Sequence, residues 1–159
     1  MANKYVSHGN TYCGDGTTSD AASVDGGVGA WNNLRDVARK VPAYGSVDDG
    51  DVIYVRTLLN GSPITLSYAE TLTFSAGGSS SAPITYIFDD GTIWGESGVI
   101  EWTCNGNYPY YINNYLQIYG GKRIKFIMDH NTATGSLNNL TTSYVEGVIV
   151  YYTNTGSGI

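Results

Sequence analysis

The chain has 159 residues, a hydrophobic fraction of 42% and a formal net charge of −6, which suits one domain, or part of one, with a packed core. Charged residues make up only 14%, so Ser, Thr, Asn, Gly and Tyr must supply most of the polar surface. The acidic balance and the lack of an extended basic stripe argue against nucleic-acid binding, and no apolar run is long enough to span a membrane.

An irregular N-terminal lead is predicted over residues 1–29, because Gly, Asp, Ser and Thr dominate residues 14–29. The segment begins at Met1 and lacks the apolar core of a secretory signal. We therefore expect a protein that is made in a cytoplasm.

Residues 31–41 (WNNLRDVARKV) predict the one helix of the chain. Apolar residues recur here at steps of three and four, which marks one face of an amphipathic α-helix, and Pro42 ends it. One helix followed only by strands suggests a cap over the open end of a stack of strands. The residues of this predicted structural cap are Trp31, Leu34, Val37 and Val41.

Beyond Pro42 the pattern becomes that of short strands separated by turn signals such as Asn60-Gly61 and Asp90-Gly91. Strands this frequent, without helices between them, suggest a sandwich, a barrel or a β-solenoid. Some are apolar on both sides, whereas a sandwich strand facing water would alternate more cleanly. The predicted strands are Val52–Val55, Thr71–Phe74, Ile84–Phe88, Val99–Trp102, Leu116–Tyr119, Ile124–Met128 and Val148–Tyr152.

Three segments resemble one known pattern. Residues 14–41 (GDGTTSDAASVDGGVGAWNNLRDVARKV), followed by 48–56 (DDGDVIYVR), resemble the start of right-handed parallel β-helix proteins of the pectate-lyase-like group. Residues 70–88 (ETLTFSAGGSSSAPITYIF) and 116–128 (LQIYGGKRIKFIM) resemble later parts of that fold. The resemblance implies an all-β fold: a right-handed parallel β-helix, or β-solenoid, with one short N-terminal capping helix. Residues 30–159 would form its single domain, either complete or part of a longer chain.

Phage tailspikes and tail fibres, polysaccharide lyases and hydrolases, and surface adhesins share this fold. We expect a bacteriophage virion structural protein, most like the N-terminal part of a tailspike or tail fibre and located in the virion. It would form a homo-oligomer, with a trimer favoured, and present a surface to host polysaccharide or to another virion protein. The alternatives are the N-terminal part of a polysaccharide lyase or glycoside hydrolase, a capsid decoration protein and a bacterial surface adhesin.

Aromatic residues crowd a Gly- and Asn-rich stretch of the second half of the chain. Flat rings with a polar tip can stack on sugars, form subunit contacts or pack beneath a loop. The expected glycan or subunit contacts are Trp94, Trp102, Tyr108, Tyr110, Tyr111 and Tyr115. Sugar cleavage commonly uses two carboxylates, for which the chain offers Asp89, Asp90, Glu96, Glu101, Asp129 and Glu146. The cation and basic motifs of the lyases have no clear counterpart, so no catalytic residue is assigned.

Metal and cofactor signals are weak. Three aspartates, at 48, 49 and 51, could gather calcium but lack a full loop of oxygen ligands, so a solvated turn is the preferred interpretation. Two cysteines (Cys13, Cys104) and two histidines (His8, His130) are too few for a convincing zinc site. We expect two reduced thiols, no metal and no cofactor.

Overall fold

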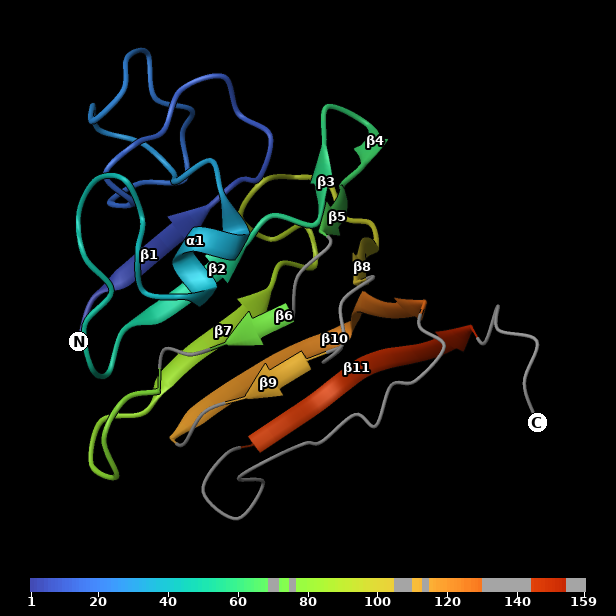
Figure 1. Ribbon diagram of the computed structural model, residues 1–159. Coiled ribbons are helices and arrows are strands. Elements are labelled where there is room, and N and C mark those ends of the chain that lie inside the picture. The colour runs from blue at the N-terminus through green and yellow to red at the C-terminus, as the bar shows by residue number, and fades with distance from the viewer. Residues whose placement is uncertain (69–71, 75–76, 105–109, 113–114, 130–143, 154–159) are drawn as a thin grey trace.

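The computed structural model describes residues 1–68, 72–74, 77–104, 110–112, 115–129 and 144–153 (Figure 1). Within these residues the chain forms strands almost throughout and one short helix. The elements are β1 (Asn3–Val6), α1 (Leu34–Ala38), β2 (Val52–Val55), β3 (Leu58–Leu59), β4 (Ser62–Pro63), β5 (Thr65–Tyr68), β6 (Leu72–Phe74), β7 (Ile84–Phe88), β8 (Ile100–Cys104), β9 (Tyr110–Ile112), β10 (Leu116–Asp129) and β11 (Tyr144–Thr153).

Parallel pairing dominates the architecture, in agreement with the expected all-β class. The main sheet has the order β1-β2-β7-β10-β8-β5, with β11 also paired to β10, and all of its pairings are parallel. A second parallel pair joins β6 to β9, and β3 and β4 form an antiparallel hairpin. Parallel neighbours usually need a crossover helix. Here the described residues between β2 and β7 contain four short strands and no helix.

Strand β10 is long because it turns a corner without losing its partners. Its first part, Leu116–Tyr119, pairs with β7, and its second part, Ile124–Met128, pairs with β8. Gly121 has a φ of +54°, and the facing Gly147 of β11 has a φ of +62°. A Cβ on Gly120 would lie 2.7 Å from the carbonyl oxygen of Gly147, so this corner has no room for side chains.

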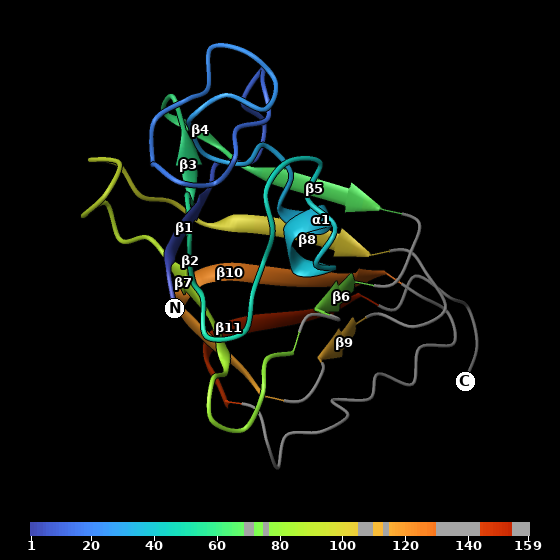
Figure 2. The same cartoon turned by 90° about the vertical axis from the view of Figure 1, so that its left-hand side faces the viewer.

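The corner divides the main sheet into two parts: β1, β2 and β7 with the first part of β10, and β5 and β8 with its second part. The core lies between these two parts. Figure 2 shows β5, β8, β10 and β11 stacked one above another, with β6 and β9 to one side of them. Phe74 of β6 lies at the centre of the core, with its ring centroid 5.2 Å from that of Tyr86, 5.9 Å from that of Trp102 and 6.3 Å from that of Phe126. All four side chains are buried. Along the strands, buried residues alternate with outward-facing ones. In β7, for example, Ile84, Tyr86 and Phe88 are buried and the two residues between them are half-buried.

The capping helix is shorter than predicted. The side chain of Asn33 accepts the N–H groups of Arg35 and Asp36 and starts the helix at Leu34. Lys40 has a φ of +62°, so the chain reverses direction soon after Ala38. Val41 lies beyond this reversal and is 58% exposed, which differs from its predicted place in the cap.

The other cap residues are buried as predicted. Leu34 and Val37 are fully buried, and the carbonyl oxygen of Val37 accepts the hydroxyl of Tyr86 at 3.2 Å, which joins the helix to the core. Trp31 is also fully buried, but it precedes the helix and forms a parallel bridge with Val6. Its indole nitrogen donates to the carbonyl oxygen of Tyr44 at 2.5 Å. The cap is thus helix α1 plus the extended residue before it.

Candidate functional site

An open groove lies on the outward face of the main sheet, over β1, β2, β7, β10 and β11. One register line crosses these five strands, because Tyr5 pairs with Tyr54, Tyr54 with Ile87, Ile87 with Tyr119 and Tyr119 with Glu146. Neighbouring residues of a strand face opposite sides of the sheet, and the residues next to these, such as Tyr86, are buried. The five side chains of the line therefore project outward.

The groove has a volume of about 510 Å³, within the usual range of small-molecule sites. We call it the tyrosine groove and define it by the aromatic residues of the register line and the charged residues beside them. These are Tyr5, Tyr54, Tyr119, Asp90, Arg123 and Glu146.

The middle of the register line has a smaller residue between two tyrosines. Tyr54 and Tyr119 stand on either side of Ile87, whose smaller side chain lowers the floor between the two rings. The rings start two strand spacings apart, or about 10 Å, because neighbouring strands lie about 4.8 Å apart. A flat ring in van der Waals contact with both would need about 7–8 Å. The slot, defined as the space over Ile87 between Tyr54 and Tyr119, therefore suits one inserted ring.

Neighbouring aromatic residues support the rings of the register line. Tyr5 stacks on Tyr54 with centroids 5.6 Å apart and an interplanar angle of 19°. Trp94 meets Tyr5 edge-on at 6.3 Å, and Tyr144 packs against Tyr119 at 5.4 Å. Tyr119 and Tyr144 remain 38% and 48% exposed, so a ligand could contact them.

Four charged residues line the groove: Asp89, Asp90, Arg123 and Glu146. The hydroxyl and N–H of Thr92 donate to Asp90, and together with Arg123 they hold the pKa of the Asp90 carboxyl below its usual value. Arg123 also donates to the carbonyl oxygen of Gly121 at 2.9 Å. On the other side, Glu146 accepts the hydroxyl of Tyr144 at 2.5 Å, which raises the pKa of that tyrosine.

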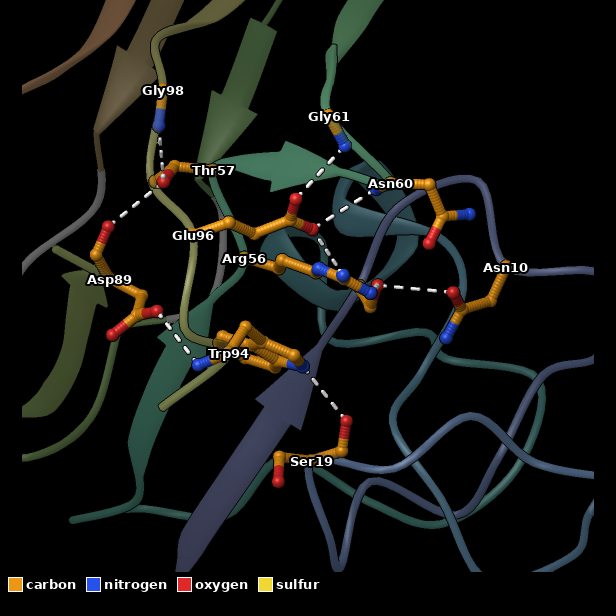
Figure 3. Close-up of polar contacts among 11 residues, drawn as sticks. Asn10, Ser19, Arg56, Thr57, Asn60, Gly61, Asp89, Trp94, Glu96 and Gly98 are labelled. Atoms are coloured by element: carbon orange, nitrogen blue, oxygen red, sulfur yellow. Dashed lines mark hydrogen bonds and ion pairs between the residues drawn. The ribbon is translucent and has the colours of Figure 1, made fainter. Parts of the chain in front are cut away.

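Loop 89–98 forms one wall of the groove and is fastened at its base (Figure 3). The buried carboxylate of Asp89 accepts the N–H of Ile93 at 3.1 Å and that of Trp94 at 3.3 Å. The buried Thr57 hydroxyl donates to the Asp89 carbonyl oxygen at 2.9 Å and accepts the Gly98 N–H at 3.2 Å. One hydroxyl therefore joins the two ends of the loop.

Glu96 ties the same loop to the β3–β4 hairpin. Its carboxylate pairs with Arg56 and accepts the backbone N–H of Asn60 at 3.0 Å and of Gly61 at 2.9 Å (Figure 3). The Gly61 hydrogen bond, followed by that of Arg56, keeps the pKa of Glu96 below its ordinary value.

Trp94 fastens the loop to the N-terminal lead. Its indole nitrogen donates to the carbonyl oxygen of Ser19 at 2.9 Å (Figure 3). Its ring also packs against Tyr5. With Thr57 and Glu96, this makes three separate attachments for one loop. The wall is consequently formed before any ligand arrives, which lowers the entropy cost of binding.

The predicted aromatic contacts are distributed over several environments. Trp94 stands beside the groove, Trp102 is 1% exposed within the core, and Tyr115 is half-buried with a φ of +55°. Tyr110 and Tyr111 belong to β9, but their side chains, like the whole of Tyr108, lie outside the described residues. Sequence reasoning missed Tyr5, Tyr54 and Tyr119, because only strand pairing brings them together.

The six predicted carboxylates also lie in different environments. Asp89, Asp90 and Glu146 line the groove, although the carboxylate of Asp89 is engaged by loop amides. Glu96 supports the loop, and Glu101 pairs with Lys125 at 3.0 Å on the other part of the main sheet. The remaining one, at position 129, ends β10, and its side chain lies outside the described residues.

The three aspartates near β2 do not converge. Asp51 is buried and accepts the N–H groups of Ala2 and Asp48, whereas Asp49 pairs with Lys40 at 3.1 Å. Across the described part of the chain, no group of three His, Cys, Asp or Glu side chains is placed to hold a metal ion.

The described side chains include one cysteine and one histidine. Cys13 is a buried free thiol, and Cys104 ends β8 with a side chain outside the described residues. His8 accepts the N–H of Leu34 through Nδ1 at 3.3 Å, whereas His130 lies outside the described residues.

The described residues contain no helix that is long and apolar enough to cross a membrane. Comparison with protein-family models, with curated proteins and with solved structures gives no match.

Proposed function

We propose that the chain is part of a bacteriophage virion protein of the tailspike or tail-fibre kind, and that its tyrosine groove binds host surface polysaccharide. In this proposal the chain is a right-handed parallel β-helix that assembles as a trimer. The groove carries the functional part of the proposal, and the order of the strand pairs supports the fold.

The strand pairs repeat in chain order, as they would in a solenoid. Strands β2, β5 and β6 pair in turn with β7, β8 and β9, and both parts of β10 then pair with β11. In the proposed solenoid, each turn of the chain would lie on the previous one. Helix α1 covers one end through the contact of Val37 with Tyr86, which suits a cap.

The single observation that carries the proposed activity is that Tyr54 and Tyr119 flank Ile87 in the groove and so bound the slot. A sugar ring has apolar C–H faces that can pack on aromatic rings, and hydroxyl groups that need polar partners. Asp90, Arg123 and the carboxylate of Glu146 supply such partners at the same groove. A register line that crosses five strands also provides room for more than one sugar unit.

The test is a substitution that fills the slot and leaves Tyr54 and Tyr119 unchanged. Ile87→Phe places a large ring on the half-buried outward position between the two tyrosines and should abolish binding to purified host surface polysaccharides on a glycan array. Ile127→Phe makes the same change at a half-buried outward position of β10 in the other part of the sheet. Equal binding by Ile87→Phe and the wild type would refute the slot as the ligand site.

The virion assignment is tested separately. Antibody labelling of phage particles should place the protein on tails, whereas labelling of heads would favour a capsid decoration protein. Light scattering of the purified native protein should give a trimer. A monomer in solution and absence from particles would contradict the structural assignment.

A depolymerase is the second candidate, because the carboxylates of Asp90 and Glu146 both line the groove. Glycosidases use a carboxylate pair as acid and base or nucleophile. Release of new reducing ends from a bound polysaccharide, and its loss in Asp90→Asn, would support this activity. Binding without any cleavage would leave the chain as an attachment protein.

A further inference from the structure

We propose that the ligand of the tyrosine groove is a neutral polysaccharide, and that the groove excludes polymers bearing carboxylate groups. This inference rests on the proposed polysaccharide binding and specifies the chemical class of ligand. It follows from the charges that line the groove and from the contacts that already engage them.

The positive charge of the groove is already balanced. Arg123 is the single cation among the described residues that line it. Its guanidinium donates to the carbonyl oxygen of Gly121 and interacts electrostatically with Asp90. A sugar carboxylate would have to compete with Asp90 for this guanidinium, and the competition would leave one of the two carboxylates without its partner.

Carboxylates outnumber cations among the described residues that line the groove. Asp90 and Glu146 both line the groove, and Glu146 accepts a hydrogen bond from the hydroxyl of Tyr144. Asp89 adds a third carboxylate to the lining of the groove, with its oxygens on loop amides. The whole chain carries a net charge of −6, which adds long-range repulsion of an anionic polymer.

The same carboxylates favour sugars without charge. An ionised carboxylate only accepts hydrogen bonds, and a neutral sugar offers several hydroxyl donors along each unit. Asp90 retains its charge readily because Thr92 and Arg123 keep its pKa low. The slot between Tyr54 and Tyr119 contributes ring contacts that do not depend on the charge of the sugar. A groove that combines aromatic stacking with carboxylate acceptors therefore suits a neutral ligand with many hydroxyl groups.

The test compares neutral and acidic polymers on one surface. The full chain is applied to an array that carries neutral bacterial polysaccharides and their uronate- or sialate-bearing counterparts of similar length. We expect binding to at least one neutral polymer and at least about tenfold weaker binding to its acidic counterpart at low salt. Higher salt should narrow this difference, because it screens the repulsion.

Glu146→Gln removes one negative charge and keeps the shape of the side chain. It should raise the relative binding of the acidic polymers several-fold, because the groove then contains one carboxylate fewer. Glu101→Gln is the matched control: it makes the same change on the other part of the sheet, where Glu101 pairs with Lys125. This control should leave the ratio of acidic to neutral binding unchanged.

The outcomes are distinguishable. Preferred binding of acidic polymers, or the same ratio in Glu146→Gln as in the wild type, would overturn the inference and leave polysaccharide binding standing. Binding to none of the polymers would overturn both the proposed function and this inference. Neutral preference with a shift in Glu146→Gln alone would support both.

Discussion

The hydroxyl of Thr57 should be a main determinant of the stability of loop 89–98. Thr57 is fully buried and makes two hydrogen bonds, donating to the carbonyl oxygen of Asp89 and accepting the N–H of Gly98. Thr57→Val keeps the shape of the side chain and removes both bonds. The buried carbonyl group of Asp89 and the half-buried N–H of Gly98 then lose their partner, and a methyl group takes the place of the hydroxyl.

The magnitude follows from these two groups. Leaving one buried donor or acceptor unsatisfied costs about 1–3 kcal/mol. Because the variant leaves one buried acceptor without a partner, and one half-buried donor that water can partly satisfy, we expect the free energy of unfolding to fall by about 1–3 kcal/mol. A single domain typically has only about 5–15 kcal/mol of stability, so this loss should be easy to measure.

Urea unfolding followed by tryptophan fluorescence measures the effect. The slope of the free energy with denaturant should stay unchanged, and the midpoint should shift. Thr57→Ser is the matched control, because it keeps the hydroxyl and deletes one methyl group at a cost of about 1 kcal/mol. If Thr57→Ser were as destabilising as Thr57→Val, packing and not hydrogen bonding would hold the loop, and the reasoning would be refuted.

Three further predictions concern the core, the loop and the effect of pH. Phe74→Ala should lower the free energy of unfolding by about 3–5 kcal/mol, because it empties the centre of an aromatic core, and a loss below 1 kcal/mol would contradict that position. Trp94→Phe keeps a ring against Tyr5 but removes the hydrogen bond to Ser19, so amide exchange in loop 89–98 should become faster while the core exchanges as before. Burial lowers the pKa of His8 from its ordinary value of 6.5, so the unfolded chain takes up a proton first and stability should fall as pH drops below that value. His8→Asn keeps an acceptor for the N–H of Leu34 without titrating, so it should flatten the change in melting temperature between about pH 5 and 8; an unchanged pH profile would exclude His8 as its cause.

Much of the strand pattern could be predicted from the sequence, because short apolar runs ended by turn residues define it locally. Val52–Val55 and Ile84–Phe88 match β2 and β7 residue for residue. Two predicted strands merge into β10, because the Gly120-Gly121 corner keeps its neighbours paired on both sides. Strand β1 was missed, since the segment NKYV is short and gains its strand conformation from pairing with β2.

The site was largely beyond prediction from the sequence. Tyr5 and Tyr54 belong to segments far apart in the chain, and only the strand register shows that they share one line with Tyr119. The predicted aromatic cluster followed closeness in sequence, but the alternation of β8 turns Trp102 inward with Ile100. Parallel stacking is a long-range property, so proximity along the chain was the wrong guide here.

The register line has a consequence for how the surface can change over time. Each of its contact positions is supplied by a different strand, and the strands are held together by main-chain hydrogen bonds that any residue except proline can make. The side chain at one position, such as Ile87, can therefore be exchanged while its neighbours at Tyr54 and Tyr119 keep their spacing of about 4.8 Å per strand. Ligand preference can therefore change by one substitution at a time, while the backbone that sets the spacing of the contact positions stays the same.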